Sequence, residues 1–168
     1  MSATLSRLQF LRGDWKGKSQ FIRPPGSQSE DHFMRHCTGC RECITTCPLS
    51  VIKADKKRYP YLDFSNTECD FCAACAAICP TEALTAFGEG IAPDSWTWRV
   101  QLHDHCLTQN NVICRSCAEI CEREAIHFRL QLGGVAQVTL DSSACNGCGA
   151  CLSICPVNAL RLTEQPHV

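Results

Sequence analysis

Four groups of four cysteines constrain this chain more than any other feature of its sequence. The chain has 168 residues and 16 cysteines, and every cysteine belongs to one of the groups. A cysteine content this high is typical either of a disulfide scaffold or of a metal protein. Three groups have the spacing C-x2-C-x2-C-x3-C followed by proline: Cys37, Cys40, Cys43 and Cys47; Cys69, Cys72, Cys75 and Cys79; Cys145, Cys148, Cys151 and Cys155.

The remaining group has a longer first gap. It consists of Cys106, Cys114, Cys117 and Cys121, and Glu122 replaces the proline. Two interpretations are open: a fourth site with an inserted loop, or a degenerate copy. All four groups are followed, at the same distance, by a small or branched apolar pair, which favours an intact site: Val51-Ile52, Ala83-Leu84, Ala125-Ile126 and Ala159-Leu160.

The N-terminus predicts the compartment, which decides between disulfides and metal. The segment LSRLQFLRG resembles a twin-arginine export motif, but Leu8 stands where the second arginine belongs, and charged and polar residues follow. We therefore expect no export signal and a cytoplasmic protein with reduced thiols. The formal net charge is −1, which excludes a strongly basic nucleic-acid surface, and no apolar run is long enough to span a membrane.

The cysteine spacing favours [4Fe–4S] clusters. Three cysteines within seven residues can bind three corners of one cube, and in two-cluster ferredoxins the fourth cysteine ligates the other cluster. Structural zinc sites instead use two separated C-x2-C pairs. We predict four clusters bound by all sixteen cysteines, with zinc or a three-cysteine cluster as the alternatives at the third group. His103 and His105 flank Cys106 and are minor candidate ligands.

The segments between the groups predict the fold. Residues 96–102 alternate as a strand expected to pair with the C-terminal NALRLT segment, and Gly133-Gly134 predicts a hairpin between groups three and four. We predict an α+β fold of two tandem bacterial two-[4Fe–4S] ferredoxin-like modules (βαβ-βαβ), small and stabilised by their clusters. Groups one and two pair, as do three and four; a nested pairing (one with four, two with three) is the alternative.

Three parts are expected along the chain. Residues 1–29 form an N-terminal arm, residues 30–90 the first module, and residues 91–168 the second. The arm is longer than a soluble carrier needs, so we hypothesise that it docks a partner through Trp15, Arg23, Pro24 and Pro25. No P-loop, dinucleotide fingerprint or nucleophile elbow occurs in the sequence, so we predict an electron-transfer or accessory protein and no enzyme.

Five segments follow one another along the chain: IRPPGS (residues 22–27), HFMRHCTGCRECITTC, NTECDFCAACAAICP, the stretched CLTQNNVICRSCAEICE and CNGCGACLSICPVNAL. In these segments and their order the chain resembles the NapF family, the ferredoxin-type accessory proteins of periplasmic nitrate reductase. The resemblance implies a cytoplasmic protein with four [4Fe–4S] clusters. It also implies binding to the catalytic molybdoprotein subunit of nitrate reductase before export, and help in its maturation. The alternatives are a general electron carrier or wire subunit and a zinc-stabilised binding module.

Overall fold

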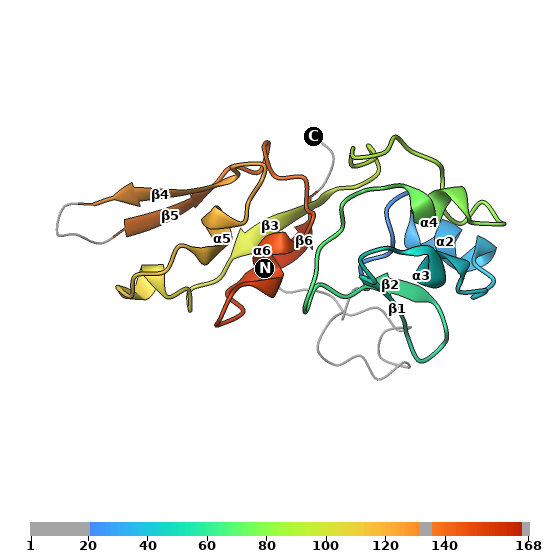
Figure 1. Ribbon diagram of the computed structural model, residues 1–168, viewed down its shortest axis with the longest axis horizontal. Helices are drawn as coiled ribbons and strands as arrows, with labels where there is room; N and C mark the ends of the chain where they lie inside the picture. The colour runs from blue at the N-terminus through green and yellow to red at the C-terminus, as the bar shows by residue number, and fades with distance from the viewer. Residues whose placement is uncertain (1–20, 132–135, 166–168) are drawn as a thin grey trace, which may run out of the picture.

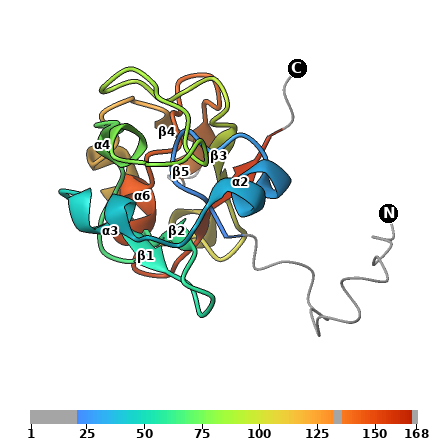
Figure 2. The same cartoon turned by 90° about the vertical axis from the view of Figure 1, so that its right-hand side faces the viewer.

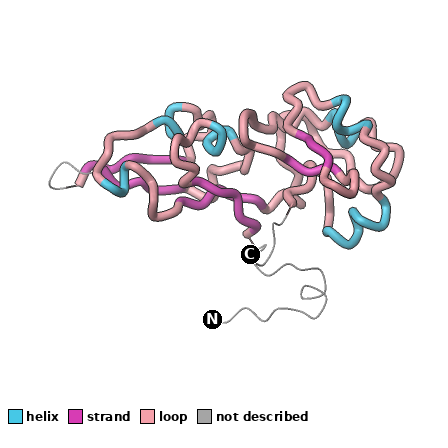
Figure 3. Tube along the Cα trace, turned by 90° about the horizontal axis from the view of Figure 1, so that it is seen from below, coloured by secondary structure: helices cyan, strands magenta, loops and turns pink. Residues whose placement is uncertain are grey.

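The computed structural model describes residues 21–131 and 136–165, which form two small halves arranged end to end (Figure 1). The first half contains α2 (Glu30–His36), α3 (Glu42–Thr46), β1 (Ile52–Ala54), β2 (Pro60–Leu62) and α4 (Ala74–Ala77). The second contains β3 (Trp98–Leu102), the 3-10 turn η1 (Thr108–Asn110), α5 (Ser116–Glu119), β4 (Ile126–Leu130), β5 (Ala136–Leu140), α6 (Ala150–Ser153) and β6 (Leu160–Glu164). Much of the described chain is loop between these short elements (Figure 3).

The second half has the predicted strand pairing. β3 pairs antiparallel with β6, with Val100 opposite Leu162, so the strand at residues 98–102 does join the C-terminal one. β4 and β5 form a second antiparallel pair, with Phe128 opposite Val138. The hairpin between groups three and four is confirmed by this register, while its predicted Gly133-Gly134 turn lies outside the described residues.

The first half uses one short hairpin. β1 and β2 are antiparallel, with Ile52 opposite Leu62, and α3 lies next to β1 (Figure 2). The side chain of Asp55 accepts hydrogen bonds from the backbone N–H groups of Lys57 (2.8 Å) and Tyr59 (2.9 Å). An aspartate that bonds to following backbone groups stabilises a turn, which explains how the charged KADKKR stretch connects the two strands.

The apolar pairs after the cysteine groups are buried in both halves. Val51, Ala83, Ala125 and Ala159 are each at most 2% exposed. In groups one, three and four the second residue of the pair begins a strand (β1, β4 and β6). After group two no strand forms, because the neighbouring chain there contains two prolines.

Those prolines belong to the N-terminal segment, and their burial corrects one prediction. Pro24 and Pro25 are less than 2% exposed and Arg23 is 8% exposed, so these three side chains are not available for docking. Backbone hydrogen bonds attach this segment to the first half: the carbonyl of Ile22 accepts a hydrogen bond from the N–H of Leu62 (2.7 Å), and the carbonyl of Gly26 accepts one from the N–H of Thr85 (2.9 Å). Proline has no N–H to donate to a ladder, so the segment lies like an outer strand without regular pairing. The first half therefore extends back to residue 22.

Arg23 ties this segment to the rest of the half. Its Nε and Nη2 donate to the two carboxylate oxygens of Glu30 (2.9 and 2.7 Å), and its Nη1 donates to the carbonyl of Pro60 (2.9 Å). The guanidinium carbon also lies 4.9 Å from the ring centroid of Phe33, the most buried side chain of α2. A buried guanidinium costs free energy unless its donors are bonded, and this arrangement bonds them on three sides.

Replacing Arg23 by alanine should therefore lower the free energy of unfolding by about 1–3 kcal/mol, because charge-assisted hydrogen bonds and ring packing are lost. Denaturant unfolding of the anaerobically purified protein, followed by circular dichroism, measures the change. Arg35→Ala, at an exposed position of α2, the helix that contains Glu30, is the matched control and should change stability by less than about 0.5 kcal/mol. Equal effects of the two substitutions would contradict the structural role given to Arg23.

Candidate metal centres

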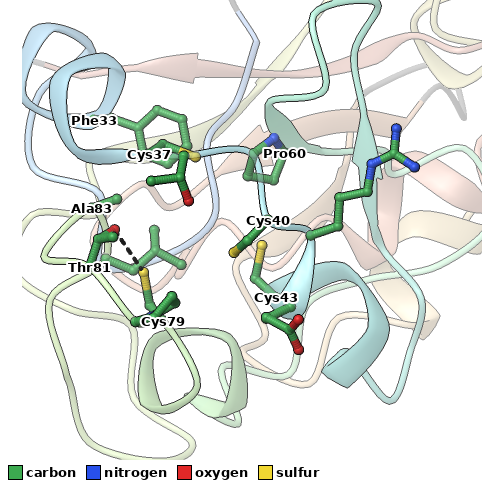
Figure 4. A pocket seen from close by; sticks show the side chains of 13 residues that line it. Phe33, Cys37, Cys40, Cys43, Pro60, Cys79, Thr81 and Ala83 are labelled. Carbon is green, nitrogen blue, oxygen red and sulfur yellow. Dashed lines mark hydrogen bonds between the residues drawn. The ribbon is translucent and has the colours of Figure 1, made fainter.

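The first site is a pocket between groups one and two. It is lined by Cys37, Cys40 and Cys43 of the first group and by Cys79 of the second. Figure 4 shows the four side chains around one common space, with Phe33 and Pro60 closing it from above. Cys37 ends α2, where its N–H donates to the carbonyl of Phe33 (2.8 Å). The helix that buries Phe33 thus also positions the first cysteine.

The other sites also combine three cysteines of one group with the last cysteine of another. Burial raises the pKa of the Cys69, Cys72 and Cys75 thiols, and the charge of the nearby Cys47 raises it further. Two more pockets in the second half each gather four cysteines. We name the four sites as follows: site one (Cys37, Cys40, Cys43, Cys79), site two (Cys69, Cys72, Cys75, Cys47), site three (Cys106, Cys114, Cys117, Cys155) and site four (Cys145, Cys148, Cys151, Cys121).

In every site the fourth cysteine comes from the other group of the same half. The structure therefore brings together groups one and two, and groups three and four, as predicted. It does not form the nested alternative, in which group one would meet group four. The pockets of sites one, three and four gather twelve of the sixteen sequence-predicted residues. We group the other four as site two because, besides burial, the charge of Cys47 raises the pKa of Cys69, Cys72 and Cys75.

The regular loops share an unusual backbone. Between the first and second cysteines, Gly39, Phe71 and Gly147 have positive φ angles (67°, 55° and 71°). Between the second and third, Arg41 and Ala73 also do (73° and 60°), as does Gly149 (88°). A loop with repeated left-handed residues turns its N–H groups towards a common centre, which favours an anion. Arg41, Phe71 and Ala73 give no sequence signal for this conformation, since non-glycine residues rarely adopt it.

The loop of site three has another backbone but a defined structure. Arg115, at the position of Arg41 and Ala73, has a φ of −133°. The inserted residues form η1, in which Thr108 is 4% exposed and its hydroxyl donates to the carbonyl of Cys114 (2.6 Å). The side chain of Asn110 donates to the carbonyl of Cys106 (2.8 Å). These two bonds hold both ends of the insertion, so the displaced Cys106 still reaches its pocket.

The geometry suits a cluster better than a single ion. Among the residues that the structure describes, no three histidine, cysteine or acidic side chains are gathered closely enough to hold one metal ion. A [4Fe–4S] cube places each thiolate on a different iron, so its ligands must surround a space, as the cysteines of site one do (Figure 4).

Burial keeps the metal-free thiols neutral. It raises the pKa of Cys43 and Cys69 to about 12, and that of Cys75 and Cys117 to about 11. Only the thiolate binds metal, so these positions would be held as thiolates only by positive iron centres. Metal ligation and deprotonation are thus coupled.

Two backbone groups also bond to cysteine sulfur. The N–H of Ala159 donates to Sγ of Cys155 (3.2 Å), and that of Ala125 donates to Sγ of Cys121 (3.4 Å). Hydrogen bonds to ligand sulfurs are one of the factors that set cluster reduction potentials. The buried alanine after each of these groups therefore serves both the core and the site, a role that the sequence pattern did not reveal.

The two histidines beside Cys106 have other surroundings. Neither His103 nor His105 is among the residues that line the pocket of site three. The ring of His105 lies 3.2 Å from the carbonyl of Asn158, measured from Nε2. Four cysteines already line that pocket, so no histidine ligand is needed there.

Comparison with known protein families agrees with this geometry. The model of the 4Fe-4S dicluster domain matches twice, over residues 36–89 and 112–159. The ferredoxin-type protein NapF of Escherichia coli K12 is 42% identical over 160 residues, which is 95% of each chain. The chain belongs to the NapF family of ferredoxin-type proteins. NapF of Haemophilus influenzae is 36% identical and covers 95% of this chain and 94% of its own.

More distant relatives share the ferredoxin-type description. The ferredoxin-type protein MauM of Methylorubrum extorquens, named for methylamine utilization, is 29% identical over 98% of this chain and 81% of its own. No solved structure gives a significant match. Within the described residues, no helix has the length and apolarity needed to cross a bilayer.

The two dicluster matches divide the NapF-family chain where the structure does, with one difference. The second match begins at residue 112 and so leaves out Cys106. The domain description alone therefore accounts for three of the four cysteines in site three. The fourth, Cys106, precedes the insertion, which the side-chain bonds of Thr108 and Asn110 hold in place.

The crossed arrangement predicts which site each cysteine serves. Cys79→Ser and Cys43→Ser, although in different motifs, should both remove the cluster of site one. Each variant should lose about four irons per chain and lack the same component in the electron paramagnetic resonance (EPR) spectrum. Cys75→Ser is the control and should remove a different component, that of site two. A spectrum in which Cys79→Ser matches Cys75→Ser would contradict the crossing.

The insertion predicts a second, milder defect. Thr108→Val removes the hydroxyl that bonds to the Cys114 carbonyl and leaves that buried acceptor unsatisfied, at a cost of about 1–3 kcal/mol. Site three should then lose iron several times faster in the presence of a chelator than in the parent protein. Gln109→Ala, at an exposed position of the same turn, should leave the rate unchanged. Equal rates in both variants would show that η1 does not support the site.

Proposed function

We propose that the chain binds four [4Fe–4S] clusters, one in each of the sites defined above, with all sixteen cysteines as ligands. The supporting observation is the exchange of the fourth cysteine between the paired motifs, which is the ligation pattern of two-cluster ferredoxins. The left-handed loops and the buried thiols support the same assignment. A cluster that is bound in this way supplies reversible one-electron chemistry.

We further propose an accessory role for this redox protein. In this proposal it remains in the cytoplasm, binds the catalytic molybdoprotein subunit of periplasmic nitrate reductase in its precursor form, and assists maturation of that subunit before export. Similarity to NapF over nearly the whole chain supports this role. General electron carriage is the alternative, and the cysteine sites considered alone support it equally well.

We assign docking of the catalytic subunit to residues 1–20, which include Trp15 and come before Arg23, Pro24 and Pro25 in the sequence. A truncation at residue 29, the boundary predicted for the arm, would remove part of the first half, because Arg23 bonds to Glu30 and Pro60. An informative truncation must therefore stop before Ile22. This proposal is separate from cluster binding and has its own test.

The cluster proposal predicts a brown protein with about sixteen irons and as much sulfide per chain after anaerobic purification. Iron and sulfide analysis, together with the EPR spectrum of the dithionite-reduced protein, measures this. A colourless protein that contains zinc or disulfides would overturn the assignment of all four sites.

The partner proposal predicts that tagged protein captures the nitrate reductase catalytic subunit from cytoplasm when the subunit still carries its leader. Deletion of residues 1–20 should weaken capture at least about tenfold while iron content stays the same, since the described first half begins after them. Deletion of residues 166–168 is the control and should not affect capture. Full capture by the shorter chain would contradict the docking role of residues 1–20. If the parent protein captured no subunit, the accessory role would be wrong and general electron carriage would be favoured.

A further inference from the structure

The ligand loops of sites two and four meet directly at the contact between the halves. The backbone N–H of Cys69 donates a hydrogen bond to the carbonyl of Cys148 at 2.8 Å. Cys69 is the first cysteine of its loop and Cys148 is the second of its own. In Figure 1 the segment that follows β2 runs towards α6, the helix that begins beside Cys148. One hydrogen bond therefore joins a residue of site two to a residue of site four.

Aromatic side chains pack against residues next to this bond. The ring of Phe64 lies against Gly149, so closely that any side chain there would collide with it. Phe71 packs edge-on against Trp96, with 5.7 Å between ring centroids, and the indole N–H of Trp96 donates to the carbonyl of Asn146 (3.0 Å). The three aromatic residues are 7%, 2% and 5% exposed. Side chains so well buried indicate a fixed contact between the loops.

Within each half the two sites are also neighbours. In the first half, α3 contains Cys43 of site one, is followed directly by Cys47 of site two, and contacts α4, which contains Cys75 of site two. In the second half, α5 contains Cys117 of site three, is followed two residues later by Cys121 of site four, and contacts α6, which contains Cys151 of site four. Combined with the Cys69–Cys148 bond, these neighbours place the sites in the spatial order one, two, four, three. This differs from the order of the motifs in the sequence.

We propose that Cys69 and Cys148 are the contact residues through which the two halves exchange electrons, in the order one, two, four, three. This rests on the cluster binding proposed above. One electron lost by site two is gained by site four, and no covalent bond forms or breaks. The path runs from the thiolate of Cys69 through its backbone N–H to the carbonyl and thiolate of Cys148. Sites one and three are the ends, where one-electron donor and acceptor proteins would act.

Two double variants test the order. Cys40→Ser with Cys106→Ser leaves sites two and four, while Cys72→Ser with Cys145→Ser leaves sites one and three. Each should retain about eight irons. After reduction with dithionite, the EPR spectrum of the first should show splitting from interaction between two neighbouring spins. The second should show two separate signals. Splitting in the second variant but not in the first would overturn the proposed order.

A further pair keeps all sixteen cysteines, in case the double variants do not fold. Phe64→Ala should loosen the junction: the splitting between sites two and four weakens, and hydrogen exchange at the Cys69 amide becomes at least about tenfold faster. Phe87→Ala is the control, because that ring lies beside Gly26 in the first half. Equal splitting and exchange in both variants would show that Phe64 and the Cys69–Cys148 bond do not form the contact.

Iron content separates this proposal from the previous one. A parent protein with far fewer than sixteen irons would contradict the proposed four clusters. A parent with full iron content, together with variants that show no splitting between sites two and four, would leave cluster binding intact and overturn only the proposed contact.

Discussion

The exchange of one cysteine between paired loops is the interaction on which the structure depends. Three cysteines of a loop line one site and the fourth extends to the neighbouring site, so neither motif of a half is complete alone. The helices between the loops are four to seven residues long, too short to be stable on their own. The loops and the buried apolar pair after each group must therefore be held by what the cysteines bind. This is why we regard the inorganic cores as part of the fold.

The two halves complete this plan in different ways. In the second half β3 supplies an outer strand for β6. In the first half the segment around Pro24 and Pro25 takes the equivalent place, and Arg23 provides through its side chain the hydrogen bonds that the prolines cannot make. A guanidinium with partners in both α2 and β2 replaces a short ladder. The RPP segment is thus explained by folding, whatever the preceding twenty residues bind.

Cysteine spacing and strand alternation were sufficient to predict much of the fold. The strand and hairpin signals between the groups indicated the pairing of motifs, and alternation around Val100 and before Cys145 predicted the two strand pairs of the second half. The burial of Arg23 was not predicted, because an arginine beside two prolines looks like an exposed linker until its partners Glu30 and Pro60 are in place. The left-handed Phe71 was also missed, since local propensity opposes that conformation, which the ligand loop requires at the same position as Gly39 and Gly147. Thr108 gave no signal because its partner carbonyl lies across an irregular loop.

The crossed cysteines have a consequence for biosynthesis. The ribosome makes Cys75, the last ligand of site two, before Cys79, the last ligand of site one. Site two therefore has all its ligands first, although the first ligand of site one is made earlier. In the other half Cys151 emerges before Cys155, and the same inversion holds. The earliest loop of each half therefore waits, with three thiols unpaired, until the last cysteine of the half has been made. During that interval the nascent chain depends on the reducing environment and on iron–sulfur donors nearby.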